Sequence, residues 1–237
     1  MHRYYSFVYF NFNPVKLAIF NGSPRNQKSN SKILMDHFLE GYQRIIPDDV
    51  PVQYLASRKH KQENLEVFHS AETVIIIFPL YTDSMPGIVK EFFEEIAKTG
   101  DAKPKNIGFI VQSGFPEAIH AAFVERYLKK FTTRMHCNYL GTVIKGGVEG
   151  IQVMPPSWTK KLFNRFKQLG EEFATSGTFS PEIKEALGKP FVLPPVRRFL
   201  IKMISKTKLA NMYWDNNLKK NNAYTKRFDK PFEENPH

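Results

Sequence analysis

Residues 15–34 read VKLAIFNGSPRNQKSNSKIL, and this stretch decides the fold. Its first part, residues 15–21, is an apolar run with the length of a buried strand. From residue 31 to residue 45, apolar side chains recur at helical spacing, which predicts an amphipathic helix. The segment between them is rich in Gly, Ser and Asn, so it is predicted to be a loop. A strand that leads through a loop into a helix predicts the first unit of an α/β sheet.

The rest of the chain repeats this alternation. Further strands are predicted at 50–55, 73–79, 105–114 and 139–147. Further helices are predicted at 87–100, 116–131 and 156–177, with a short one at 63–71. Residues 73–79 are β-branched and apolar on both faces, as is typical of a fully buried parallel strand. Five strands with intervening helices predict a doubly wound five-stranded parallel α/β sheet, in which we expect the strand order 2-1-3-4-5.

Three parts of the chain are expected from these patterns. Residues 15–178 are predicted to form the α/β domain, and residues 179–237 a basic extension that is mostly helical or irregular. Residues 1–14 are aromatic and lack the pattern of the domain. They are either an N-terminal arm or edge strand, or a leader that precedes a true start at Val15. We do not expect a signal peptide, because no small-residue cleavage site follows.

Charge and composition restrict the classes of function. The chain carries a net charge of +11, and a basic surface attracts nucleic acid, anionic lipid or phosphorylated small molecules. No nucleic-acid partner is expected, because no known binding motif accompanies the charge. Cys137 is the single cysteine, which excludes an intrachain disulfide or an all-cysteine metal site and favours the cytoplasm. No metal site is predicted.

Unusual residues gather in three loops, 21–31, 79–87 and 113–120, which follow the first, third and fourth predicted strands. In the order 2-1-3-4-5 these three strands are neighbours. Ligands of open α/β sheets bind outside the carboxyl ends of the strands. The three loops are therefore expected to line one crevice.

The first loop is predicted to bind a monophosphate. Ser23 and Ser29 offer hydroxyl groups, and Asn30 and Ser31 lie where a helix N-terminus exposes unpaired N–H groups. Arg25 adds a fixed positive charge that matches a phosphate group. The alternative is a plain helix cap, since Ser and Asn are preferred capping residues.

The second and third loops are predicted to hold a flat ring. Pro79, Leu80, Tyr81 and Met85 offer an apolar wall, and Thr82 a polar contact to the edge of the ring. Ser113 and Gly114 allow a close approach of the backbone, with Phe115 as a cover. His120 is a possible proton donor. The alternatives are a buried loop with a satisfied tyrosine, and a structural histidine.

The segments LAIFNGSPRNQKSNS, PLYTDSMPGIVKEFFE and VQSGFPE resemble the phosphate-binding and ring-binding loops of the flavodoxin-like NAD(P)H-dependent FMN reductases. This family includes quinone-reductase, azoreductase and iron–sulfur-flavoprotein branches. The similarity extends over about residues 15–175, and the cysteine cluster of the iron–sulfur branch is missing.

The resemblance implies FMN as cofactor and NAD(P)H as co-substrate. Ser23, Arg25, Ser29, Asn30 and Ser31 would surround the phosphate. Pro79, Leu80, Tyr81, Thr82 and Met85 would lie beside the isoalloxazine ring, and Ser113, Gly114 and Phe115 near its pyrimidine side. No side chain is required as an acid or base, so Tyr81 and His120 remain candidates only. A small-molecule electron acceptor and a homodimer are also implied. The alternatives are an electron carrier of the flavodoxin type and a flavin-free binding module.

Residues 194–206 predict a basic amphipathic helix. Its apolar face could lie on a membrane surface, pack on a partner subunit, or cover the flavin site. From sequence alone, packing within the protein or its dimer is favoured over membrane contact. Residues 211–232 mix aromatic, amide and cationic side chains, which is compatible with a lid over the site or with a polar surface structure.

Overall fold

The computed structural model describes residues 15–99 and 105–230, so the expectation for residues 1–14 lies outside the described residues. The chain divides into two compact units, and the division falls between Val192 and Leu193. We expected the extension to start at residue 179. The contacts place the following residues with the first unit instead, because Phe179, Ile183 and Leu187 are buried in its core.

The first unit contains a five-stranded sheet in which every pair of neighbouring strands is parallel. Its strands are β1 (Val15–Asn21), β2 (Val52–Tyr54), β3 (Ala71–Pro79), β4 (Asn106–Gln112) and β5 (Asn138–Lys145). Their order is β2-β1-β3-β4-β5, which confirms the predicted topology. From Val74 onward β3 is buried at every position, as expected for a central strand that is covered on both faces.

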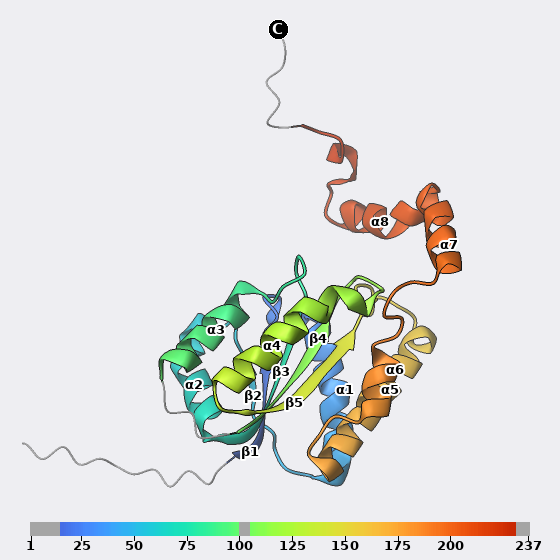
Figure 1. Ribbon diagram of the computed structural model, residues 1–237. Coiled ribbons are helices and arrows are strands. Elements are labelled where there is room, and N and C mark those ends of the chain that lie inside the picture. The colour runs from blue at the N-terminus through green and yellow to red at the C-terminus, as the bar shows by residue number, and fades with distance from the viewer. Residues whose placement is uncertain (1–14, 100–104, 231–237) are drawn as a thin grey trace, which may run out of the picture. The chain divides into compact units, whose positions relative to one another are not determined.

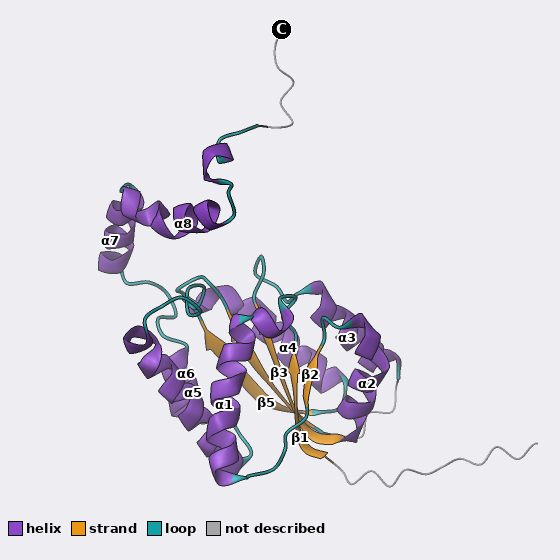
Figure 2. Cartoon of the chain, turned by 180° about the vertical axis from the view of Figure 1, so that it is seen from behind, coloured by secondary structure: helices purple, strands orange, loops and turns teal. Residues whose placement is uncertain are grey.

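Helices cover both faces of the sheet (Figures 1 and 2). One face carries α1 (Asn30–Ile45), α5 (Pro156–Ser176) and α6 (Pro181–Leu187). The other face carries α2 (Lys61–Ser70), α3 (Gly87–Lys98) and α4 (Ala122–Arg134). Each face has its own cluster of buried apolar side chains, so the two layers of helices are held to the sheet by separate cores.

Helices α1 and α5 pack closely through two glycines. A Cβ atom built on Gly41 would lie 1.8 Å from the carbonyl oxygen of Lys167, and one built on Gly170 would lie 2.0 Å from that of Phe38. No side chain fits in these positions without moving backbone. The two glycines therefore set the distance between α1 and α5. Helix α1 is the helix that follows the first loop, residues 21–31.

The helix predicted at 116–131 begins later than expected. A short 3-10 turn spans Ala118–Ala121, and α4 starts at Ala122. The N–H groups of Ala118 and Ile119 donate to the carbonyl oxygens of Pro190 and Phe191, which lie beyond α6. Because of these tertiary hydrogen bonds, residues 116–121 belong to the loop after β4 and not to helix α4.

The second unit contains two helices in its described residues, α7 (Pro195–Ser205) and α8 (Met212–Lys220), with short 3-10 turns at Lys208–Asn211 and Tyr224–Lys226. The predicted amphipathic helix at 194–206 corresponds to α7.

Candidate functional site

The three loops singled out in the sequence leave the carboxyl ends of three adjacent strands, β1, β3 and β4. Hydrogen bonds join them where the strands end. The N–H of Gly22 donates to the carbonyl oxygen of Ile77 at 2.8 Å, and the N–H of Leu80 donates to that of Gln112 at 2.7 Å. The polar loops therefore start side by side along one edge of the sheet.

The first loop is held by its own side chains. The carboxamide oxygen of Asn21 accepts the N–H of Ser23 at 2.9 Å, and the hydroxyl of Ser23 accepts the N–H of Arg25 at 3.3 Å. The hydroxyl of Ser29 caps α1, since it accepts the N–H of Lys32 at 3.1 Å and donates to the carbonyl of Asn26 at 2.6 Å. Ser29 is thus a helix cap, which is the alternative that the sequence left open for this loop.

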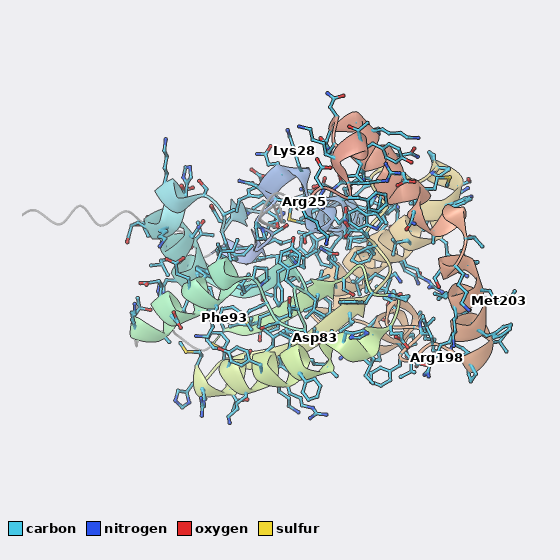
Figure 3. The ribbon with its side chains drawn as sticks, turned by 90° about the horizontal axis from the view of Figure 1, so that it is seen from above. Arg25, Lys28, Asp83, Phe93, Arg198 and Met203 are labelled. Carbon is cyan, nitrogen blue, oxygen red and sulfur yellow. The ribbon has the colours of Figure 1, made fainter. Side chains whose placement is uncertain are left out.

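These internal hydrogen bonds determine what the first loop can offer to a ligand. The residues Ser23, Ser29 and Ser31 are buried, whereas Arg25 is exposed. The N–H groups of Asn30 and Ser31 lie in the first turn of α1, where a helix provides no acceptors of its own. An anion here would be bound by backbone N–H groups and the guanidinium group of Arg25 more than by hydroxyl groups. Figure 3 shows Arg25 beside Lys28 on this segment.

A fourth loop, residues 146–155, completes the edge, and sequence reasoning missed it. The side-chain amide of Asn30 donates to the carbonyl oxygen of Val148 at 2.7 Å, and the N–H of Val148 donates to that of Ser113 at 3.0 Å. The signal was present, because this loop also follows the carboxyl end of a strand and begins with Gly146 and Gly147. Asn30 is consequently a link between loops as well as a residue of the first turn.

Gln112 is a further part of the site that sequence reasoning missed. Its side-chain amide donates to the hydroxyl of Ser31 at 3.3 Å, so the end of β4 is tied to the start of α1. In the third loop the hydroxyl of Ser113 donates to the carbonyl of Phe115 at 3.2 Å. Gly114 is exposed, and a Cβ atom built on it would lie 3.4 Å from Oε2 of Glu149. The carboxylate of Glu149 in the fourth loop therefore lies beside the glycine of the third loop.

The second loop forms a tight two-residue turn. Tyr81 and Ser84 exchange backbone hydrogen bonds of 2.8 and 3.1 Å, and Thr82 and Asp83 between them have φ angles of 49° and 58°. A positive φ is unfavourable for a β-branched residue such as threonine, so strain is stored at this tip. Pro79 and Leu80 are buried, and Leu80 belongs to the core on the α2–α4 face. Of the residues expected beside a ring, Tyr81 and Thr82 are exposed and Met85 is half-buried.

His120 joins the second and third loops. Its Nδ1 lies 3.3 Å from a carboxylate oxygen of Asp83, and its Nε2 lies 3.7 Å from one of Glu117. Its ring stacks on Phe115 with 4.4 Å between ring centroids. These contacts give His120 a structural role in holding the two loops together. Tyr81 and Phe115 remain 45% and 46% exposed, so an aromatic surface is available at this edge.

The donors and acceptors of this edge fit a phosphate ester that also carries hydroxyl groups. The first turn of α1 and Arg25 supply donors for the phosphate. The side-chain oxygen of Asn30 is buried and has no hydrogen-bond partner within the described residues, so an acceptor is left unpaired beside these donors. FMN carries a phosphate, a polyhydroxylated chain and a flat aromatic ring, and the residues present are compatible with all three.

The fold and the position of the site define a class: a doubly wound α/β protein with its candidate site at the carboxyl edge of a 2-1-3-4-5 sheet. The model of the family described as flavodoxin-like fold matches residues 15–162. The chain belongs to this family. Among curated protein sequences, none matches the chain significantly.

Solved structures with the same fold are similar over most of their own length. An NADPH-quinone reductase from P. pentosaceus has a TM-score of 0.50 and 16% identity, with 65% of this chain and 96% of that chain covered. An NAD(P)H:quinone oxidoreductase from Methanothermobacter marburgensis has a TM-score of 0.52 and 14% identity, with coverage of 68% and 98%. The general stress protein 14 of Treponema denticola, solved in complex with FMN, has a TM-score of 0.52 and 14% identity, with coverage of 68% and 98%. At these identities the likeness establishes the fold.

Proposed function

We propose that this protein is an FMN-dependent NAD(P)H oxidoreductase that passes electrons to a small acceptor such as a quinone, an azo or nitro compound, or a free flavin. One observation carries the proposal. The first turn of α1 and Arg25, which carry donors suited to an anion, lie at the same sheet edge as the exposed side chains of Tyr81 and Phe115. The names of the structural relatives, two quinone reductases and one FMN complex, support it.

In this proposal the chain's own residues bind and orient the cofactor. Backbone N–H groups of α1 and Arg25 hold the phosphate, and the second and third loops hold the ring. Backbone N–H groups of those loops stabilise negative charge near the ring. Bound FMN supplies the chemistry of hydride acceptance from a nicotinamide and electron donation to the acceptor. Because the cofactor supplies this chemistry, Tyr81 and His120 act in positioning. We also propose a homodimer and a cytoplasmic location.

The absorption spectrum of the purified protein, reconstituted with FMN, tests the proposal. We expect flavin absorption bands at roughly 370 and 450 nm. Under anaerobic conditions these bands should bleach on addition of NADPH or NADH and return when a quinone is added. Bands that persist with both nicotinamides would favour an electron carrier of the flavodoxin type. A protein that fails to bind FMN would contradict the proposed site.

A further inference from the structure

The second unit is more basic than the rest of the chain. Residues 193–230 contain ten Lys and Arg residues against two Asp residues. Residues 1–192 are themselves basic, with 24 Lys and Arg against 19 Asp and Glu. The two units therefore carry net charges of the same sign, as do two copies of this chain, and an anionic surface complements the second unit in net charge.

Helix α7 presents an apolar stripe that its own unit does not bury. Five side chains fall within an arc of about 140° on a helix of 3.6 residues per turn. They are Val196, Phe199, Leu200, Met203 and Ile204, and they are between 50% and 70% exposed. None of the side chains that the structure describes in residues 193–230 is buried. Such a contiguous apolar face is unusual on a surface helix and marks an interaction site.

Cations border this stripe along the helix. Arg197 lies next to one edge of the stripe, and Lys202 and Lys206 lie next to the other. Arg198 lies farther from the stripe and donates through its Nε to the carbonyl oxygen of Leu193 at 3.1 Å. Figure 3 marks Arg198 and Met203 on this helix. The helix contains no acidic residue, so its own sequence offers no carboxylate for these cations.

This arrangement suits one environment, the boundary between water and an anionic bilayer. There an apolar stripe enters the acyl region, and the long side chains of Arg and Lys at its edges reach back to the lipid phosphates. Exposed Met212 and Trp214 on α8 and Phe228 beyond it add apolar and aromatic surface to the same unit. Within the described residues, no helix is long and apolar enough to cross a bilayer. Binding of this kind is peripheral.

We propose that α7 docks this protein onto an anionic lipid surface, with Phe199 and Met203 among the stripe residues that insert. The sequence alone favoured packing within the protein or its dimer. The net positive charge of residues 1–192, and a stripe that its own unit leaves exposed, are the grounds for an anionic lipid surface instead. A nucleic acid would meet the cations but leave the apolar stripe in water, so the stripe argues for lipid.

Flotation of the full-length protein with lipid vesicles tests this proposal. We expect binding to vesicles of phosphatidylcholine mixed with phosphatidylglycerol, and at least about tenfold weaker binding to phosphatidylcholine alone. High salt should weaken the binding, because the surface charges are then screened.

Matched variants separate the stripe from general hydrophobicity. Replacing Phe199 and Met203 by Gln should lower vesicle affinity about tenfold or more. The variant Ile201→Gln is the control, since Ile201 lies outside the stripe between Arg197 and Ser205, and it should bind within about twofold of the parent. Replacing Arg197, Lys202 and Lys206 by Gln should remove the preference for anionic lipid. The melting temperature of each variant checks that the first unit is intact.

Three results would overturn the proposal. The first is absence of flotation with the anionic vesicles. The second is a loss of vesicle binding in the control variant Ile201→Gln that is as large as the loss in the double variant of Phe199 and Met203. The third is binding of a DNA duplex in preference to the vesicles, unaffected by the Phe199 and Met203 replacements, which would assign the cations of α7 to nucleic acid.

Discussion

The side-chain amide of Asn30 donates a hydrogen bond of 2.7 Å to the carbonyl oxygen of Val148, a residue 118 positions later in the chain. This bond ties the first turn of α1 to the loop that follows β5. It is buried, and the other atom of the same amide, Oδ1, has no partner within the described residues. One side chain thus ties two loops of the candidate site together and leaves one acceptor without a partner within the described residues.

Replacing Asn30 by Ala should weaken both the fold and the site. The carbonyl of Val148 would lose a buried donor, which costs about 1–3 kcal/mol of the free energy of unfolding. FMN affinity should fall roughly tenfold, in line with that loss. Gln152 is the matched control, because its amide joins the same two loops through an exposed bond of 3.2 Å to the carbonyl of Lys28. Equal losses in Asn30→Ala and Gln152→Ala, measured by urea unfolding and flavin fluorescence, would contradict this account.

Replacing Arg25 by Gln should lower FMN affinity roughly tenfold, since a charge-assisted contact to phosphate is lost. Affinity for riboflavin, which has the same ring but no phosphate, should stay within about twofold. The variant Lys28→Gln removes an exposed cation from the same segment and should change FMN affinity much less. Fluorescence titration with both ligands measures these differences. If Arg25→Gln weakened riboflavin as much as FMN, the guanidinium group would not be the phosphate contact.

Replacing Gly41 by Ala should destabilise the protein by about 3 kcal/mol or more, because the new methyl group would overlap backbone of α5. The built Cβ lies 1.8 Å from the carbonyl oxygen of Lys167. Gly87, the first residue of α3, provides the control, since a Cβ there meets no atom within 4 Å. Gly87→Ala should change stability by less than about 1 kcal/mol. Denaturant unfolding of both variants decides whether the α1–α5 contact is as close as described.

The free energy of unfolding should decrease as the pH rises through the alkaline range, because of Tyr139. Burial is the main cause that raises the pKa of its phenol from 10.0 to about 12. Between these values the unfolded chain releases a proton that the folded protein keeps, so the folded state becomes less favourable as pH rises.

The variant Tyr139→Phe isolates this effect. Below pH 10 it should differ from the parent by a constant amount, which includes the loss of the 2.7 Å hydrogen bond to Thr142. Above pH 10 the parent should lose stability relative to the variant by up to about 1.4 kcal/mol per pH unit. Unfolding curves across that range measure the difference. A difference that stays constant up to pH 12 would show that the phenol titrates normally.

Much of the fold could be predicted from short segments. The apolar run of β3 and the helical spacing of α1 are local patterns, and their bounds agree with the structure to within a few residues. The start of α4 could not be predicted, because it depends on hydrogen bonds from Ala118 and Ile119 to residues beyond α6. The extent of the first compact unit depends on such contacts too, since Phe179 and Ile183 are buried in a core that distant elements form.

For the candidate site, the sequence by itself determined that the first three loops lie at the carboxyl edge and which polar residue types they carry, because alternating strands and helices predict a parallel sheet with these loops at one end. Only the tertiary structure decided how those groups are used. Ser29 became a helix cap, Asn30 a link to Val148, and Gln112 a partner of Ser31. The reason is physical. A buried hydroxyl or amide must find a hydrogen-bond partner, and for Asn30 and Gln112 that partner comes from a segment far away in the sequence.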